Sequence, residues 1–375
     1  MVPRILYVVT EDWYFLSHRL PMARAAKAAG YEVHVAARIK DGRAAIDKEG
    51  FVPHGLSWSR GSISPLGSFS ATLELRRLFR SVNPDIVHNV ALKPVLIGTV
   101  ASLGRNGTAV VNSLTGLGAV FVDNGGSGRL TRKVVEFALR YLLKRARSCT
   151  VVQNPDDRRF LVDLGVPANT IAVIPGSGVD INTLQILPEP PPPVTAAYVG
   201  RMLRQKGVMT LIDAFKLLTS RGVKLRLLLA GDCDRENPGS LAPEQLREFA
   251  SAYGIQWLGH VADIRDVWRQ AHFAVQPSRG GEGLPKSLLE AAACGRAMVA
   301  TDVPGCREIA IDGVTALTVP VDDPAALADA MARLAEDAAM RERFGKAARH
   351  LVETEFSADA IGRQTVALFD RLVGR

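Results

Sequence analysis

Two glutamates, Glu282 and Glu290, stand in the segment PSRGGEGLPKSLLEAAACG. The apolar run HFAVQP before it predicts a buried strand, and LPKSLLEAAAC predicts a helix whose first turn tolerates the proline. Glu282 then falls in the loop before the helix, and Glu290 more than one turn inside it. Free N–H groups at Gly283 and Leu284 and the helix dipole favour an anion, so a carboxylate there indicates a ligand that also offers hydroxyl groups. The alternative is that Glu282 is a solvated loop residue and that Lys286 and Glu290 form a pair on the helix surface.

Two cations follow an apolar run near the middle of the chain. TAAYVG ends at Gly200, which permits a close turn, and Arg201 and Lys206 follow in GRMLRQKG. A guanidinium fork and an ammonium group at the carboxyl end of a strand make a clamp for a diphosphate if they face an anion-binding helix start. Either residue alone is more often a solvated side chain. Their combination with the two glutamates favours a binding site.

Apolar runs of strand length alternate with helical stretches along the whole chain. The runs are RILYVVT, EVHVAA, DIVHNV, TAVVNSL, SCTVVQ and TIAVIP, and then TAAYVG, KLRLLLAG, IQWLG, HFAVQP, RAMVAT and ALTVP. This alternation predicts an α/β protein with parallel sheets covered by helices on both faces. A proline-rich segment, residues 187–194, separates the two series as a stiff spacer. We therefore expect two Rossmann-like, doubly wound domains, 1–186 and 195–355, a terminal amphipathic helix, 356–375, and a ligand site in the cleft between the domains.

The charge of the chain is concentrated in its first half. Residues 1–186 hold 23 Lys and Arg against 14 Asp and Glu, and residues 187–375 hold 23 against 24, so their net charges are +9 and −1, in agreement with +8 for the chain. Part of the excess lies on the predicted helix GRLTRKVVEFALRYLLKRARS, where Arg132, Glu136, Arg140 and Lys144 form a polar stripe. This stripe fits either the hydrated edge of a core helix or a surface that meets anionic lipid. Nucleic acid is disfavoured as a partner, because no recognition-helix, finger or aromatic ribonucleoprotein signature is found.

Several other classes are disfavoured. The four cysteines, Cys149, Cys233, Cys294 and Cys306, lack C-x-x-C spacing, which argues for a reducing compartment without disulfides or a zinc site. The start, MVPRILYVVTED, lacks the apolar core of a signal peptide, and the run KPVLIGTVASLG is too short to span a bilayer. Asp232-Cys233-Asp234 mimics a metal-binding D-x-D but follows a strand end, so we expect no metal or other cofactor. A cytoplasmic protein, soluble or peripheral to the membrane, is expected.

The segments GRMLRQKG, LLLAGDCD, WLGHVADI and PSRGGEGLPKSLLEAAACGRAMVATDVPGCREI resemble the family 4 retaining glycosyltransferases of the GT-B fold. Glu282 and Glu290 match the E-x7-E signature of that family. The resemblance covers nearly the whole chain, and DIVHNVALKP, NSLTGLGAVF, VVQNPDDRRF and IPGSGVD fit a branch that builds lipid-linked bacterial polysaccharides. It implies two Rossmann-like domains that face each other across a cleft, with the C-terminal helix crossing back to the first domain.

The resemblance also implies roles for the matching residues of the second domain. Arg201 and Lys206 would bind the nucleotide diphosphate, Glu282 would hydrogen-bond hydroxyls of the donor sugar, and Glu290 would take the ribose hydroxyls. Donor contacts through the backbone are implied for Gly200, Gly283, Leu284, Pro285 and Lys286. The segment Trp257 to Ile264 would line the base pocket, with the backbone near Val261 reading uracil.

The first domain departs from the family pattern. Many relatives have a glycine-rich loop after the first strand, whereas this chain has TEDWYFLSHRLPMA, so contacts to the acceptor or donor fall to side chains. Those candidates are Trp13, Ser17, His18 and Arg19, and Gly116 of NSLTGLG offers a close loop nearby. Ser17 fits equally the N-cap of the following helix. His88 is a candidate catalytic residue at the end of the DIVH strand, but Val90 stands where relatives often have a second histidine, and a satisfied structural histidine is the alternative.

The reaction implied is transfer of a hexose or N-acetylhexosamine from a UDP-sugar to a polyprenyl-diphosphate-linked saccharide, for O-antigen, capsule or exopolysaccharide. A double displacement would need a carboxylate nucleophile about 5 Å from its partner, and none is evident, so same-face attack is expected. The enzyme would work at the inner face of the cytoplasmic membrane, with its basic half toward anionic lipid. A UDP-sugar epimerase of the same fold and a nucleotide-sugar-binding protein without turnover are the alternatives, and GDP stays open as the nucleotide.

Overall fold

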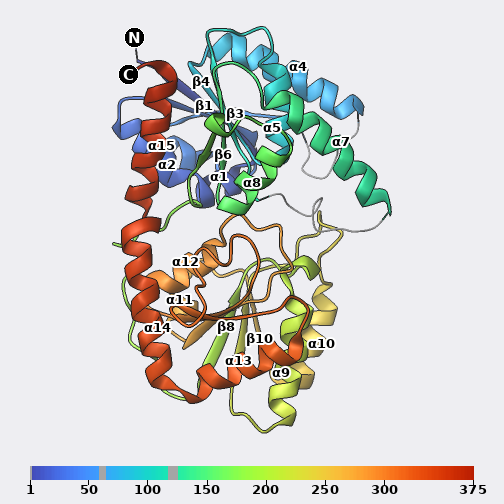
Figure 1. The fold of residues 1–375 in the computed structure, drawn as a ribbon, viewed down its shortest axis with the longest axis vertical. Helices are drawn as coiled ribbons and strands as arrows, with labels where there is room; N and C mark the ends of the chain where they lie inside the picture. The colour runs from blue at the N-terminus through green and yellow to red at the C-terminus, as the bar shows by residue number, and fades with distance from the viewer. Residues whose placement is uncertain (1, 59–64, 117–125) are drawn as a thin grey trace. The chain divides into compact units, whose positions relative to one another are not determined.

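The computed structural model describes residues 2–58, 65–116 and 126–375 and divides into two compact units (Figure 1). Unit 1 comprises Met1–Gly178 and Ala358–Arg375, and unit 2 comprises Val179–Ser357. Each unit contains a parallel sheet with helices on both faces. The predicted α/β class with two doubly wound, Rossmann-like domains is confirmed.

The strands described in unit 1 lie in the order β3-β2-β1-β4-β5-β6-β7. Their bounds are Arg4–Glu11 (β1), Glu32–Arg38 (β2), Val52–Gly55 (β3), Ile86–Val90 (β4), Ala109–Ser113 (β5), Ser148–Val152 (β6) and Ile171–Val173 (β7). Side chains alternate across the sheet, so Ile5 and Tyr7 enter the core on one face, and Leu6 and Val8 enter the core on the other. Burial on both faces explains why most of these strands are continuous apolar runs.

The helices of unit 1 cover both faces of this sheet. They are Asp12–His18 (α1), Leu20–Ala28 (α2), Arg43–Lys48 (α3), Pro65–Val82 (α4), Leu92–Ala101 (α5), Gly126–Leu142 (α7), Pro155–Asp163 (α8), the 3-10 turn Ala168–Thr170 (η1) and Ala358–Val373 (α15). Apolar side chains of α2 and α15 share one core, and α4 and α5 contribute to a core on the opposite face. α15 packs closely on α2, since a Cβ added at Gly362 would stand 2.8 Å from the Cβ of Ala25.

Helix α7 is apolar on two sides. Val135 and Leu139 are buried in a core shared with α5 and α8. A second row of apolar side chains faces solvent: Leu130, Val134, Phe137 and Tyr141. Arg132 pairs with Glu136 at 2.7 Å beside that row. α7 is thus a core helix with a polar edge, as one alternative has it, and it also presents an apolar row to solvent.

The strands described in unit 2 lie in the order β10-β9-β8-β11-β12-β13. Their bounds are Thr195–Val199 (β8), Arg226–Ala230 (β9), Gln256–Gly259 (β10), Phe273–Gln276 (β11), Ala297–Thr301 (β12) and Ala316–Val319 (β13). Each of these strands was predicted from its apolar run. β8 and β11 are neighbours although they are not consecutive, so the chain reverses its direction of winding between them. Such a switch point is where parallel sheets of this type bind ligands.

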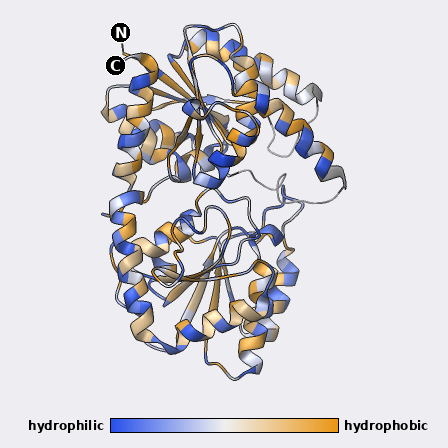
Figure 2. Ribbon diagram, in the orientation of Figure 1, coloured by the Kyte–Doolittle hydropathy of each residue, from blue (hydrophilic) through white to orange (hydrophobic). Residues whose placement is uncertain are grey.

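The helices of unit 2 flank this sheet. They are Arg204–Lys206 (η2, a 3-10 turn), Val208–Ser220 (α9), Pro243–Tyr253 (α10), Arg265–Trp268 (α11), Lys286–Ala293 (α12), Pro324–Glu336 (α13), Ala338–Leu351 (α14) and the π-helical turn Val352–Phe356 (η3). α9 and α13 build the core on one face, and α11 and α12 the core on the other. Figure 2 shows the strands of each unit as mostly hydrophobic, with mixed colouring on the helices around them.

The proline-rich segment, expected to separate the domains, lies within unit 2. The guanidinium of Arg296 donates to the carbonyls of Leu187 and Pro188 at 3.0 and 2.8 Å, and Arg341 pairs with Glu189 at 2.7 Å. The start of the segment is thus fixed to unit 2. The chain passes from unit 1 to unit 2 earlier, between Gly178 and Val179, in the IPGSGVD turn.

Among the described helices, none is long and apolar enough to cross a membrane. Within residues 2–58, 65–116 and 126–375, no group of three or more His, Cys, Asp or Glu could hold a metal ion. The four cysteines are free thiols.

Candidate functional site

The residues predicted to bind the donor gather at the carboxyl ends of β8 and β11 in unit 2. Gly200 and Arg201 follow β8, and the loop that contains Glu282 follows β11. The 3-10 turn η2 carries Lys206 and is followed directly by α9. Since the two strands are neighbours at the switch point of the sheet, the fold brings both loops to one place.

Close backbone contact fixes these two loops against each other. A Cβ added at Gly207 would stand 1.7 Å from the carbonyl oxygen of Pro277, and the φ of Gly207 is +72°. A side chain is excluded at this position on both counts. Arg279 N also donates to the Gln205 carbonyl at 3.0 Å. The positions of Lys206 and Glu282 are therefore set by backbone packing.

Lys206 and Glu282 are in direct contact. The Nζ atom of Lys206 lies 2.5 Å from Oε1 and 2.7 Å from Oε2 of Glu282, and Ser278 Oγ donates to Oε1 at 2.7 Å. Burial by itself raises the pKa of the Glu282 carboxyl, but Lys206 and the Ser278 hydrogen bond outweigh it, so the pKa lies below its usual value. Glu282 is thus an ionised hydrogen-bond acceptor in a buried position.

Arg201 lies beside this pair and is held by a residue that sequence reasoning did not assign. Its Nη1 donates to Asp234 Oδ2 at 2.8 Å, and its carbonyl accepts a hydrogen bond from Tyr198 Oη at 2.9 Å. The positive charge of Arg201 also contributes to the lowered pKa of Glu282. Asp234 belongs to the D-C-D motif that mimics a metal site. Its adjacency to Arg201 follows from the pairing of β8 with β9, which the motif alone does not reveal.

Glu290 lies on α12, and its carboxylate is buried. The helix begins at Lys286, and Pro285 is its N-cap residue. Pro285 thus directly precedes the first helical turn, in which it was predicted to lie. Lys286 Nζ lies 3.2 Å from Glu290 Oε1, so the predicted pair exists, but Glu290 is 9% exposed and is no solvated surface residue. Burial raises the pKa of Glu290, and Lys286 lowers it only in part.

The remaining donor-binding candidates lie along the same edge of the sheet. Gly283 and Leu284 lead into α12 and are buried. A Cβ added at Gly200 would stand 2.8 Å from Tyr198 Oη, so a side chain there would displace the tyrosine. Val261 follows β10 and packs partly against the core of unit 2, while Trp257 Nε1 donates to the Gly231 carbonyl at 2.9 Å.

In unit 1, His88 lies in the middle of β4 and is buried. Its Nε2 lies 2.7 Å from Ser113 Oγ, and its ring packs on Tyr7 and Phe369. Burial, and then the charge of Arg19, lower the pKa of His88 well below its usual value, so the imidazole is neutral. Nδ1 has no hydrogen-bond partner in the described part of the chain. His88 therefore does not lie at the strand end, and only one of its two ring nitrogens has a hydrogen-bond partner among the described residues.

The residues around α1 take different positions from those expected. Ser17 lies inside α1, where its Oγ contacts His18 Nδ1 at 2.6 Å, and the N-cap of α2 is Arg19. The alternative that Ser17 caps the following helix is therefore wrong. His18 stacks on Tyr14 with 4.3 Å between ring centroids. Trp13 is exposed, whereas Arg19 is buried. Gly116 has a φ of +98°, which suits a turn, and residues 117–125 of the NSLTGLG loop and its sequel lie outside the described residues.

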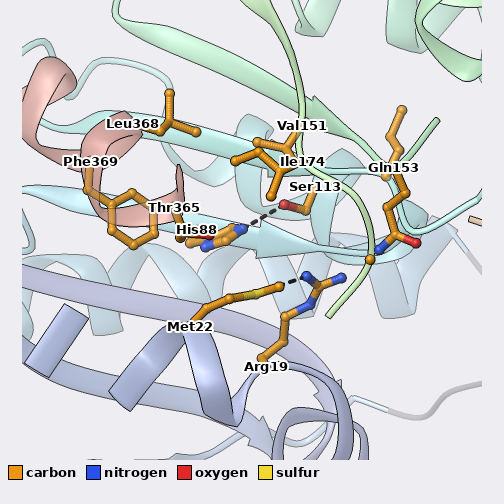
Figure 3. A pocket seen from close by; sticks show the side chains of 12 residues that line it. Arg19, Met22, His88, Ser113, Val151, Gln153, Ile174, Thr365, Leu368 and Phe369 are labelled. Atoms are coloured by element: carbon orange, nitrogen blue, oxygen red, sulfur yellow. Dashed lines mark hydrogen bonds between the residues drawn. The ribbon is translucent and has the colours of Figure 1, made fainter. Parts of the chain in front are cut away.

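Arg19 and His88 line one hollow of unit 1 (Figure 3). Ser113, Gln153 and Gly176 contribute from the ends of β5, β6 and β7, and Thr365, Leu368 and Phe369 from α15. The hollow is small and opens to solvent at its mouth. Sequence reasoning named His88 and Arg19 separately, without any sign that they share a cavity.

Two family models match the chain. A model described as "Glycosyl transferases group 1" matches residues 193–337, in unit 2, and one described as "Glycosyl transferase 4-like" matches residues 4–153, in unit 1. The chain belongs to the family 4 glycosyltransferases. The predicted family is thus confirmed, and with it the activity of a glycosyltransferase.

Several relatives of this glycosyltransferase match nearly its whole length. It is 26% identical to the N,N'-diacetylbacillosaminyl-diphospho-undecaprenol alpha-1,3-N-acetylgalactosaminyltransferase of Campylobacter jejuni, over 96% of this chain and 98% of the relative. Its fold is similar to that of sucrose-phosphate synthase from Thermosynechococcus elongatus, with a TM-score of 0.82, 20% identity and 99% of both chains covered. Anabaena HepE, solved in complex with UDP and glucose, gives a TM-score of 0.77 at 18% identity, over 98% of this chain and 99% of that one.

Proposed function

We propose that this glycosyltransferase moves a hexose or N-acetylhexosamine from a UDP-sugar to a polyprenyl-diphosphate-linked saccharide, with retention at the anomeric carbon, in the assembly of a bacterial surface polysaccharide. The observation that carries the proposal is the partly buried Lys206–Glu282 contact at the switch point of unit 2, with Arg201 in the loop that follows β8. The Campylobacter relative, named for a lipid-linked acceptor, and the neighbour solved with UDP and glucose support the choice of acceptor and donor.

The cations of the site suit a departing diphosphate. Arg201 offers a planar fork and Lys206 a point charge, and the N–H groups that lead into α12 add the positive end of a helix dipole. Charge grows on the diphosphate as the bond to the sugar breaks, so these groups stabilise the transition state more than the ground state. Glu282 holds Lys206 in place before the donor binds and then accepts hydrogen bonds from hydroxyls of the donor sugar.

Glu290 suits the ribose. A buried carboxylate can accept hydrogen bonds from two hydroxyl groups without competition from water. Hydrogen bonds to a charged acceptor are among the stronger ones in proteins. The segment around Val261, on the same edge of the sheet, would meet the uracil base through its backbone.

Retention is proposed to follow from attack on the face that the diphosphate leaves. The departing phosphate oxygen accepts the proton of the acceptor hydroxyl, the new glycosidic bond forms as the old one breaks, and UDP leaves with the bonding electrons. No carboxylate nucleophile is needed, and Glu282, bound to Lys206 and Ser278, is committed to hydrogen bonding.

The acceptor is proposed to bind unit 1, which is the basic part of the chain. The exposed apolar row of α7, flanked by Arg132, Arg140 and Lys144, suits the interface of an anionic membrane, where such helices bury apolar side chains among the headgroups. The enzyme would then be peripheral on the inner face of the cytoplasmic membrane, without a metal or other cofactor.

One experiment tests the proposal. The protein is incubated with a panel of UDP- and GDP-sugars and a short lipid-diphosphate saccharide, and nucleotide release and the mass and anomeric configuration of the product are measured. We expect release of UDP and an acceptor heavier by one hexose or N-acetylhexosamine, with the donor's configuration. A changed sugar on the nucleotide without transfer would indicate the epimerase, and tight nucleotide-sugar binding without any product would indicate a binding protein.

A further inference from the structure

Arg19 is a buried cation without a counter-ion. Its side chain is 3% exposed, and its Nη1 donates to Met22 Sδ, a weak acceptor, at 3.3 Å. The atoms Nε and Nη2 have no hydrogen-bond partner among the described residues, and Arg19 forms no ion pair with any of them. A charged group in this state is strongly unfavourable unless something neutralises it.

Two more polar atoms in this part of unit 1 are buried without a partner among the described residues. Tyr7 Oη and His88 Nδ1 lack partners in the part of the chain that the structure describes, and their rings are 4.9 Å apart. Burial raises the pKa of Tyr7 above its usual range and lowers that of His88, and the positive charge of Arg19 acts on both groups. Unpartnered buried groups are rare singly, so their grouping points to a ligand.

Other buried arginines of the chain show what a structural role looks like. Arg296, which is 1% exposed, donates to the carbonyls of Trp268, Leu187 and Pro188. Arg341 donates to the Leu334 carbonyl and pairs with Glu189. In both cases protein oxygens satisfy the guanidinium. Arg19 differs from them in that its fork faces a hollow (Figure 3).

That hollow lies where a parallel sheet binds ligands. Arg19 comes after β1, and Ser113, Gln153 and Gly176 stand at or after the carboxyl ends of β5, β6 and β7. Thr365 and Phe369 of α15 close the opposite side. Loops beyond the carboxyl ends of the strands are the usual binding edge of such sheets, so the cavity is open to a ligand at the functional edge of unit 1.

We propose that this hollow binds a small oxyanion, a phosphoryl or carboxylate group, with the Arg19 guanidinium as its cation. The planar fork of arginine matches two oxygens of such a group, and His88 and Ser113 line the same space. The site belongs to unit 1 and is separate from the Arg201–Lys206 clamp of unit 2. That the oxyanion is part of the acceptor rests on the proposed function, whereas the binding of an oxyanion does not.

The test uses the full chain and reads each unit separately. Hydrogen exchange is followed by mass spectrometry on peptides covering residues 12–28 of unit 1 and 199–207 of unit 2, with sodium phosphate, sodium acetate or sodium chloride added at equal ionic strength. The variants are Arg19→Met, Arg19→Lys and Arg201→Met. Arg24→Met is the matched control, because Arg24 lies in α2, whose N-cap is Arg19, is exposed and pairs with Glu49.

We expect phosphate or acetate to slow exchange of the 12–28 peptides severalfold in the wild type, in Arg201→Met and in Arg24→Met. Arg19→Met should abolish this effect, and Arg19→Lys should keep part of it. Without added oxyanion, Arg19→Met should be at least as stable as the wild type, because an unpartnered buried charge has been removed. A purely structural arginine would instead destabilise unit 1 when replaced.

Three results would overturn the proposal: no protection of the 12–28 peptides in the wild type by either oxyanion, equal protection in a folded Arg19→Met, or equal protection by chloride. The first and third need no variant, so the test stands even if Arg19→Met does not fold. A free saccharide phosphate and a lipid-linked diphosphate as further additions distinguish the source of the group. A protein that fails to transfer sugar but shows Arg19-dependent protection would refute the proposed function alone.

Discussion

Glu282 and Glu290 are buried to the same extent, yet the structure shifts their pKa values in opposite directions. Burial raises both. The difference lies in the partners: Glu282 has Lys206 on both of its oxygens and a hydroxyl donor as well, whereas Glu290 has one contact to a lysine that is partly exposed. Two carboxylates that the sequence shows as a symmetric motif are therefore one firmly ionised group and one that binds protons more readily.

Replacing Glu290 should separate stability from donor binding. A buried carboxyl with a raised pKa lowers stability once pH rises through that pKa, because the ionised form is disfavoured in the folded state. Glu290→Gln should thus leave the free energy of unfolding at pH 7 equal to or above that of the wild type, and the difference should vanish below about pH 4. Urea unfolding between pH 4 and 8 measures this. The KM for the donor should rise roughly tenfold or more, and a strongly destabilised variant would contradict the assignment.

Removing either cation of the clamp should reduce turnover with little effect on folding. Arg201→Ala and Lys206→Ala each delete a charge that faces the leaving diphosphate, so kcat should fall by about 10² to 10³. Steady-state UDP release measures it, with circular dichroism to confirm folding. Lys216→Ala is a suitable control, since Lys216 is a surface residue of α9 paired with Asp213. Near-normal turnover in a folded clamp variant would argue against a diphosphate at this place.

At this scale, the sequence reveals residue types and spacing but not long-range partners. The E-x7-E spacing and the two cations predicted a common site, and the fold places Lys206 on Glu282. The Arg201–Asp234 pair escaped prediction because it depends on the pairing of β8 with β9. That Arg19 is buried without a counter-ion was not predicted either, because the neighbouring sequence does not distinguish a buried arginine from a solvated one.

The loop elements of the unit 2 site depend on glycines that admit no side chain. Gly207→Ala should be much more costly than Gly222→Ala, although both residues have left-handed φ values of +72° and +75°. A Cβ at position 222 meets nothing within 4 Å, whereas at position 207 it overlaps the Pro277 carbonyl. Gly222→Ala should cost about 1 kcal/mol from backbone strain alone, and Gly207→Ala should cost more and also lower turnover. Thermal unfolding and UDP release test this, and equal effects of the two would contradict the packing argument.

Helix α7 should bind anionic membranes through its exposed face. Each basic residue near such a surface contributes about 1 kcal/mol, so replacing Arg132, Arg140 and Lys144 by glutamine should weaken binding to vesicles with anionic lipid on the order of a hundredfold. Phe137→Ser, at a side chain that is 66% exposed, should weaken it as well. Co-sedimentation measures binding, with Arg221, Lys224 and Arg247 of unit 2 neutralised as a charge-matched control. Unchanged vesicle binding would remove the membrane from the proposed function.

Helices and strands were predictable where a single hydrophobic pattern dominated the sequence. Continuous apolar runs identified every strand of unit 2, because parallel strands are buried on both faces. β3 escaped, since its sequence VPHG is short, partly exposed and contains a proline, which suits the edge of a sheet. For α7 the hydrophobic pattern showed an apolar helix but did not show that its apolar side chains are divided between a core and solvent.

Over the whole molecule, unit 1 is discontinuous in sequence and unit 2 is continuous. The proline run suggested a later boundary, because prolines interrupt regular structure wherever they occur. Its first residues are instead fixed by Arg296 and Arg341. The terminal helix α15 places Ile361, Leu368 and Phe369 in the core of unit 1, and Tyr31 Oη donates to Asp370 at 2.6 Å. Unit 1 therefore needs both ends of the chain.

This asymmetry predicts how the chain can be divided. A fragment of residues 179–357 keeps both cores of unit 2 and the Lys206–Glu282 contact, so it should fold alone and bind UDP. A fragment of residues 1–178 lacks α15 and exposes the apolar surface of α2 and the sheet, so it should aggregate or melt at lower temperature. Residues 358–375 added as a peptide or by circular permutation should restore a cooperative transition. Calorimetry of the fragments and UDP titration measure these outcomes. If the fragment of residues 1–178 is as stable alone as it is with residues 358–375 added, α15 is dispensable to unit 1.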